Sequence, residues 1–118
     1  MYLMLIIVNK RETVNKILEM FLKIGIGGAT VLDSRGMGQT FMACESPVVG
    51  GLRAMIYDQC RPGNNTIISI VETLEKYDQA VEEAEKITGS FDEPGTGLAC
   101  VFPLARIKGF PNKNNKKL

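Results

Sequence analysis

The 118-residue sequence contains no histidine, which removes the commonest protein metal ligand and the usual general base near neutral pH. Catalytic sites that pair a serine or cysteine nucleophile with histidine are therefore excluded. The three cysteines, Cys44, Cys60 and Cys100, form no CxxC pair and are odd in number, so reduced thiols are expected. The remaining acidic and thiol side chains form no recognisable catalytic constellation, and we expect no enzyme activity.

Long hydrophobic runs are also missing. Residues 1–8 are apolar, but this run is too short to span a bilayer and has neither a basic leader nor a cleavage site. We therefore expect a cytoplasmic protein without membrane insertion. The net charge is +1, with acids gathered in residues 72–86 and lysines in residues 112–118. A nearly neutral chain with one acidic helix is not typical of nucleic-acid-binding proteins.

The length and the 45% hydrophobic content indicate one globular domain, residues 1–110, followed by a basic flexible tail, residues 111–118. Residues 2–8 are continuously apolar, as in a central strand buried on both faces. Asn9 and Glu12 have the spacing of a capping box. The helix that follows is predicted to end at Gly25. Its expected buried stripe comprises Val14, Ile17, Leu18, Phe21 and Leu22.

Residues 29–36 are interpreted as a strand in which Ala29, Val31, Asp33 and Arg35 share one face and Thr30, Leu32 and Ser34 the other, so that the two faces are unlike. Glycines stand on both sides of it, at 27, 28, 36 and 38. On spacing alone, a helix stop and a turn explain them more simply than peptide N–H groups freed for an anionic ligand. Residues 37–65 show no sustained helical period, although residues 48–49 and 52–57 can form short strands around Gly50 and Gly51.

Residues 66–72 predict a third strand, and Thr73 predicts the N-cap of a second helix that ends at Thr88 and Gly89. The expected apolar stripe of this helix comprises Leu74, Tyr77, Val81 and Ala84, widened by Ala80 and Ile87. Residues 98–107 predict a fourth strand. Pro103 cannot donate a ladder hydrogen bond, so this strand belongs at a sheet edge or ends near Pro103.

The order strand, helix, strand, long loop, strand, helix, strand predicts an α+β fold, a ferredoxin-like βαββαβ sandwich with both helices on one face of the sheet. The other face then needs a cover. Burying it against further copies of the chain is the simplest solution, so an oligomer is expected from the architecture.

The pattern GATV-x-D-S-x-G-x-G at residues 28–38, the long insertion after it and the glycine-rich loop before the last strand resemble the PII signal-transduction superfamily. This resemblance covers residues 3–108. It implies a homotrimer for nitrogen regulation, with effector sites in clefts between subunits. The loop 37–65 would be the T-loop, which docks onto a target transporter or enzyme, and the loop 88–97 would be the B-loop.

The resemblance assigns the effector site by motif. It implies no obligatory cofactor and an adenine nucleotide as the effector. The residues carried over on the strand-two side are Thr30, Gly36, Met37, Gly38 and Gln39. Those carried over on the phosphate side are Gly89, Gly95, Thr96 and Gly97, with Arg106 and Lys108 as candidate phosphate clamps in a shifted register.

The chain also departs from that family. Leu98 stands where the family has a phosphate-binding lysine, and Thr40 stands where it has a glutamine. Gly109 and Pro111 occupy the places of two arginines. Asp92 and Glu93 lie in a lengthened loop and would repel a triphosphate. These departures favour an effector that is smaller or less charged than ATP.

A second function class stays open. Trimers of the copper-tolerance type share this topology, and a soft metal could be held by Cys44, Cys60 and the methionines Met37, Met42 and Met55. The cysteines are far apart in sequence, which favours the regulator over the metal-binding protein.

Overall fold

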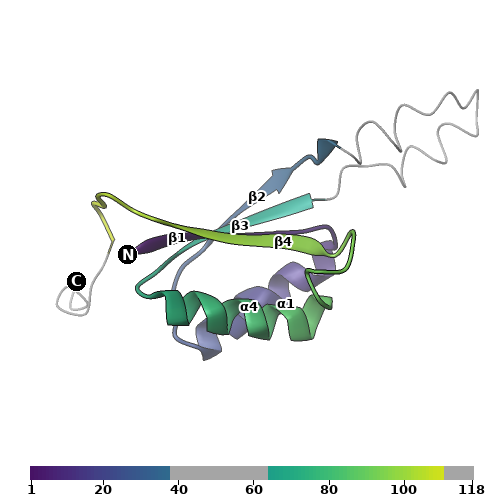
Figure 1. Ribbon diagram of the computed structural model, residues 1–118, viewed down its shortest axis with the longest axis horizontal. Coiled ribbons are helices and arrows are strands. Elements are labelled where there is room, and N and C mark those ends of the chain that lie inside the picture. The colour runs from purple at the N-terminus through teal and green to yellow at the C-terminus, as the bar shows by residue number, and fades with distance from the viewer. Residues whose placement is uncertain (38–63, 111–118) are drawn as a thin grey trace, which may run out of the picture.

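The computed structural model describes residues 1–37 and 64–110 as one four-stranded antiparallel sheet with two helices (Figure 1). The elements in chain order are β1 (Tyr2–Val8), α1 (Arg11–Lys23), β2 (Thr30–Ser34), β3 (Asn64–Val71), α4 (Leu74–Thr88) and β4 (Gly97–Pro103). The strands lie in the order β2-β3-β1-β4, and both helices cover the same face of the sheet. This is the predicted α+β, ferredoxin-like fold.

Strand β1 lies at the centre of the sheet, between β3 and β4, as its unbroken apolar sequence predicts. Met4, Ile6 and Val8 point toward the helices and are at most 1% exposed. The alternate side chains of β1 point to the other face and are only half-buried in the single chain. The prediction of burial on both faces is therefore met on the helix side alone.

Helix α1 buries a stripe that is rotated from the predicted one. Its buried residues are Thr13, Val14, Ile17, Met20 and Phe21. Leu22, predicted to be in the stripe, is 69% exposed. Helix α4 approaches the core through Ala80 and Ala84, which are fully buried, whereas Leu74 at its start is 46% exposed. Small side chains on α4 allow the two helices to pack closely over the sheet.

The starts of the two helices differ. Thr73 caps α4 as predicted, because its hydroxyl accepts a hydrogen bond from the Lys76 backbone N–H at 3.1 Å. The predicted capping box of α1 is wrong: Lys10 is the N-cap residue, with no side-chain cap. Asn9 instead donates its side-chain amide to the carbonyl of Gly95, far away in the sequence. A local motif is thus replaced by a tertiary contact.

Helix α1 ends at Gly25, as predicted, through a pair of backbone hydrogen bonds. The Ile26 N–H donates to the Phe21 carbonyl at 2.7 Å, and the Gly25 N–H donates to Leu22 at 3.3 Å, with Gly25 at a φ of 91°. Ile26 and Phe21 are both buried, which is the apolar contact that accompanies this helix ending. The Lys76 ammonium adds a hydrogen bond to the Ile24 carbonyl, so α4 helps to close the end of α1.

The remaining boundaries shift by a few residues. Strand β2 is shorter at both ends than the predicted 29–36, and β3 begins two residues earlier than predicted. Strand β4 lies at a sheet edge and ends at Pro103 rather than at 107, as expected for a residue without an N–H donor. The predicted short strands around Gly50 and the predicted tail lie outside the described residues, as do Thr40, Cys44 and Cys60. Neither described helix is long and apolar enough to cross a membrane.

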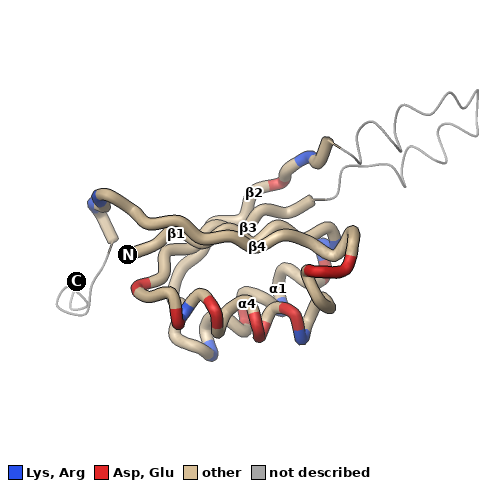
Figure 2. Tube along the Cα trace, in the orientation of Figure 1, with Lys and Arg blue, Asp and Glu red and all other residues tan. Residues whose placement is uncertain are grey.

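The sheet face opposite the helices is apolar and carries no layer of its own chain in the described ranges (Figure 1). Figure 2 shows the charged residues gathered over the helices and the connections, while β1, β3 and β4 contain none. On this open face Leu98 is 55% exposed, Leu32 47% and Phe102 42%. The apolar residues that share the face by strand register are Leu3, Leu5, Ile7, Leu32, Ile68, Ile70, Leu98, Cys100 and Phe102, and its polar residues, Thr30, Ser34, Asn64 and Thr66, lie in β2 and the start of β3.

Gly25 gives a direct test of this account of α1. We expect Gly25→Ala to lower the free energy of unfolding by about 1 kcal/mol, because a side chain is unfavourable at positive φ. Gly28→Ala is the matched control, since a Cβ there meets nothing within 4 Å and its φ is not positive. Urea denaturation of the two variants compares them, and an equal effect of both would contradict the assignment.

Candidate functional site

Residues 89–97, which run from the C-cap of α4 to the first residue of β4 and are called the loop 89–97 below, lie within the predicted loop 88–97, the phosphate-side half of the predicted effector site. The loop 89–97 begins at Gly89, which ends α4 with a φ of 94°. It closes at Gly97, where an added Cβ would lie 2.5 Å from the Ile7 carbonyl oxygen and 3.1 Å from the Phe91 ring. Only glycine permits this approach of the loop to β1. The glycines at both ends therefore have structural reasons to be there.

The backbone donors of this loop are mostly used within the chain. The Phe91 N–H donates to the Glu85 carboxylate at 2.8 Å, from the last turn of α4. Further backbone N–H groups donate to neighbouring oxygens: Asp92 to the Ser90 hydroxyl, Glu93 to the Ser90 carbonyl and Thr96 to the Glu93 carbonyl. A glycine-rich turn binds phosphate well when its backbone N–H groups are free. The structure leaves few such donors.

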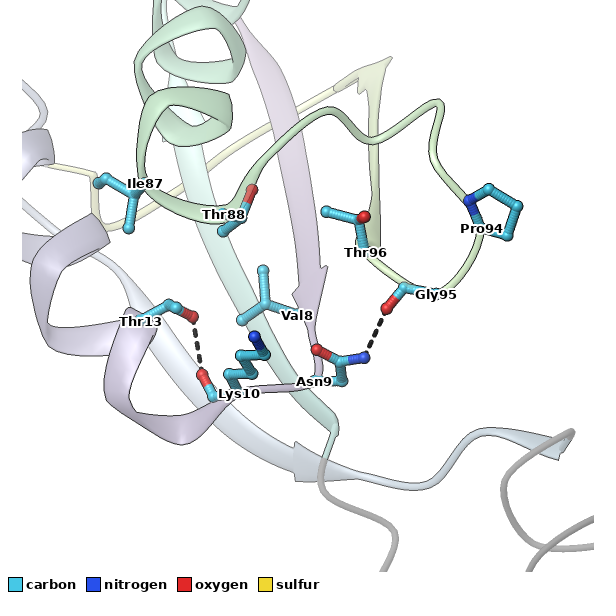
Figure 3. Close-up of a pocket in the computed structure, with 9 residues that line it drawn as sticks. All are labelled: Val8, Asn9, Lys10, Thr13, Ile87, Thr88, Pro94, Gly95 and Thr96. Atoms are coloured by element: carbon cyan, nitrogen blue, oxygen red, sulfur yellow. Dashed lines mark hydrogen bonds between the residues drawn. The ribbon is translucent and has the colours of Figure 1, made fainter.

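Behind the loop lies a hollow of about 170 Å³ (Figure 3). It is bounded by the end of β1, the start of α1 and the end of α4. Gly95 and Thr96 line it from the loop, and Asn9, which bonds to Gly95, lines it from the opposite wall. Two of the residues predicted to bind an effector thus face a cavity within a single chain.

The strand-two half of the predicted site lies at the other edge of the sheet. Thr30 opens β2 and is exposed, while Gly36 and Met37 follow the strand. Gly38 and Gln39 lie outside the described residues. The strand is held by β3, and the Thr66 hydroxyl donates to the Ser34 hydroxyl at 2.8 Å. An exposed pair between Arg11 and Asp33, 3.7 Å apart, adds little stability.

The two halves lie at the same end of the sheet but at opposite edges. Val8 is paired with Gly97 on one side and with Asn65 on the other, and Asn65 is paired with Asp33. Three strand spacings therefore separate the end of β2 from the start of β4, roughly 14 Å at about 4.8 Å each. Within one chain the two halves do not meet.

Arg106 and Lys108 lie farther still. They follow β4, whose final residue Pro103 is paired with Tyr2 at the opposite end of the sheet from the loop 89–97. The seven residues of β4 alone span roughly 20 Å. Both side chains are exposed. The structure does not bring them to the predicted phosphate side of their own chain.

The local charge near the loop is negative. Asp92 and Glu93 are exposed in the loop, and Glu85 supports it from α4. Leu98 occupies the position where the resemblance places a lysine. The contact of Glu85 with the loop was not predicted from the sequence, where Glu85 is one of several acids in residues 72–86. Its position four residues before the helix-ending Gly89 was the available signal.

Groups for acid–base or metal chemistry do not gather in the described part of the chain. Within residues 1–37 and 64–110, no three His, Cys, Asp or Glu side chains are placed to hold a metal ion. Burial raises the pKa of the Tyr77 phenol, and the charges of Cys100 and Asp78 add to this, so the phenol stays protonated. The cysteines of the soft-metal alternative, Cys44 and Cys60, are not among these residues.

No protein-family model matches the sequence, and no curated protein is similar to it in sequence. Solved structures do match. The chain is 20% identical to Arabidopsis thaliana PII bound to citrate, with a TM-score of 0.59 over 97% of this chain and 90% of that one. It is 15% identical to a PII-like signaling protein from Thermus thermophilus, with a TM-score of 0.53 over 86% of this chain and 82% of that one. The chain therefore has the fold of PII and PII-like signalling proteins.

The contact between Glu85 and Phe91 can be tested by substitution. We expect Glu85→Ala to speed hydrogen exchange at the Phe91 amide and to cost about 1 kcal/mol of stability, because that amide loses its acceptor. Glu82→Ala is the control, since Glu82 is exposed on the same helix. Unchanged Phe91 exchange in Glu85→Ala would show that the carboxylate does not hold the loop.

Proposed function

We propose that this chain is a divergent PII-like regulatory protein. It assembles as a homotrimer, binds a small effector in the clefts between subunits and acts on a partner protein through residues 37–65. The main observation behind this proposal is the position of the two halves of the predicted effector site (the half-sites), which lie at one end of the sheet but on opposite edges. Neighbouring copies, rather than one chain, can bring the β2 end and the 89–97 loop together.

The open sheet face supports the assembly. It presents Leu32, Leu98 and Phe102 to solvent, each more than 40% exposed, next to the half-buried centre of β1. Apolar surface of this extent is unfavourable in water and marks an interface. In a cyclic trimer each copy uses two different surface patches, so the β2 edge of one copy adjoins the β4 edge of the next. Three such contacts close the ring and give three equivalent clefts.

The loop 89–97 limits the effector. Its backbone donors are largely used internally, and Asp92 and Glu93 add negative charge. A triphosphate brings up to four negative charges and needs many donors, whereas a monophosphate or a small anion needs few. We therefore assign to the cleft an adenine nucleotide with few phosphates or a smaller anion. The match to a PII bound to citrate is in keeping with a small anionic ligand.

The partner is contacted through residues 37–65 in this proposal. That stretch lies between β2 and β3, and its first three residues, Met37, Gly38 and Gln39, are also assigned to the effector site, so effector and partner contacts adjoin. An effector can change such a segment only if its contacts differ between the segment's two states. In this proposal the partner is a transporter or an enzyme. The protein acts in the cytoplasm and takes part in nitrogen regulation, as the resemblance to the PII superfamily implies.

Effector binding is measured by calorimetry of the full chain against AMP, ADP, ATP, cyclic AMP and bicarbonate. We expect AMP, cyclic AMP or bicarbonate to bind more tightly than ATP, because the loop 89–97 offers few donors. Gly38→Val should weaken that binding and leave the trimer intact, since Gly38 is assigned to the effector site. No heat from any of the five, or a trimer lost in Gly38→Val, would contradict the assignment.

The assembly is tested with two apolar-to-glutamate changes on opposite sides of the molecule. Phe102→Glu places a charge on the open sheet face, and we expect the trimer to dissociate to monomers. Leu22→Glu is the matched control: Leu22 is 69% exposed on the helix face, and its variant should remain a trimer. Sedimentation equilibrium gives the masses. A monomeric native protein, or a trimeric Phe102→Glu, would refute the assembly.

A further inference from the structure

The hollow behind the loop 89–97 brings two residues of the predicted effector site, Gly95 and Thr96, next to the β1–α1 junction, which the sequence analysis did not assign to any site (Figure 3). Three threonines, one asparagine and one lysine supply its polar lining, and Val8, Ile87 and Pro94 supply its apolar lining. We propose that this hollow binds a small oxyanion, an inorganic anion or a short carboxylate, through Lys10, Asn9 and Thr96.

The charge of the lining favours an anion. Lys10 is the one ionisable residue among the lining residues, and Figure 3 shows its side chain directed among Val8, Asn9 and Thr13. In the described ranges no carboxylate lies within ion-pair distance of its ammonium; the pairs found there join Arg11 to Asp33 and Lys86 to Glu83. An unneutralised ammonium beside a partly enclosed space attracts an anion more strongly than one in open solvent.

The hydrogen-bonding groups divide into used and available donors. The Thr13 hydroxyl donates to the Lys10 carbonyl at 2.7 Å, and the Thr88 hydroxyl donates to the Gly89 carbonyl at 2.8 Å. The Thr96 hydroxyl has no partner within the described part of the chain, and Asn9 uses one of its two amide protons on Gly95. Three donors therefore remain to bind an anion: the Lys10 ammonium, the Thr96 hydroxyl and the second Asn9 proton.

The start of α1 adds to the attraction, although it does not define the site. Helix α1 has no side-chain cap; in its first turn the Thr13 N–H donates to the Lys10 carbonyl at 3.1 Å, while the N–H groups of Arg11 and Glu12 receive no side-chain acceptor from the N-cap residue. The positive end of the helix dipole faces the same region as Lys10. The helix dipole and the Lys10 ammonium therefore both attract an anion to this region.

The volume of the hollow favours a small ligand. Its volume of about 170 Å³ is below the roughly 300–1,000 Å³ of pockets for drug-sized ligands. A hollow of this size suits an oxyanion of a few heavy atoms.

Binding here would also affect the loop. Asn9 already joins the β1–α1 junction to Gly95, and an anion held by Lys10 and Thr96 adds a second connection between the same two segments. A ligand that binds the closed loop stabilises it. The inference does not require the trimer, although two of the lining residues, Gly95 and Thr96, are also assigned to the effector cleft.

The test is an amide-resolved NMR titration of the full chain with sodium phosphate, bicarbonate and acetate, each matched to sodium chloride at equal ionic strength. We expect saturable shifts at Lys10, Thr13, Gly95 and Thr96 for at least one of the three, with a dissociation constant of about 1 mM. Lys10→Met should weaken binding about tenfold, since it removes the charge and keeps the apolar stem. Thr96→Val should also weaken it.

Lys16→Met is the matched control, because Lys16 is exposed on α1 and does not line the hollow. It should bind as the native protein does. The monomeric variant Phe102→Glu should retain oxyanion binding even if it loses nucleotide binding, which separates this site from the cleft. Shifts that do not saturate, that match those in sodium chloride, or that persist undiminished in Lys10→Met would overturn the proposal.

Discussion

The structure depends on the strict alternation of side chains in the two central strands. In β1 and β3 every second residue is buried under α1 and α4, and most of the residues between them are apolar as well. A strand that is apolar on both faces cannot be satisfied by helices on one face only, because the hydrophobic effect acts on both. The helices therefore cover one face of the sheet, and exposure of the other, largely apolar face to water is unfavourable.

The positions of the half-sites follow from the same sheet. Because β1 and β3 occupy the centre, β2 and β4 become the edges, and the glycine-flanked ends of both edges fall at one end of the sheet. The loop 89–97 reaches this end already ordered by Glu85, Ser90 and Asn9. In the proposed trimer, one arrangement of the copies both covers the open face and joins the two edge ends.

Much of the fold could be predicted from the local sequence. The central strand, the stops at Gly25 and Gly89, the Thr73 cap and the edge position of the Pro103 strand depend on nearby residues and were predicted correctly. The errors concern side chains whose roles depend on distant partners. Asn9 bonds to Gly95 across the fold, and Met20 replaces Leu22 because the orientation of a helix on its sheet is set by packing. The two halves of the effector site stay predictions from motifs, and the distance between these motifs depends on strand order, which nearby residues do not determine.

Cys100 reports most directly on whether the open face is covered. It lies on that face, half-buried in the single chain, and a Cys44→Ser/Cys60→Ser variant leaves it as the only thiol. The decisive measurement is the rate at which a thiol-alkylating reagent modifies Cys100 in the native variant, compared with the unfolded chain. The account predicts a thiol protected until the assembly dissociates. Alkylation at a rate close to that of the unfolded chain would contradict it.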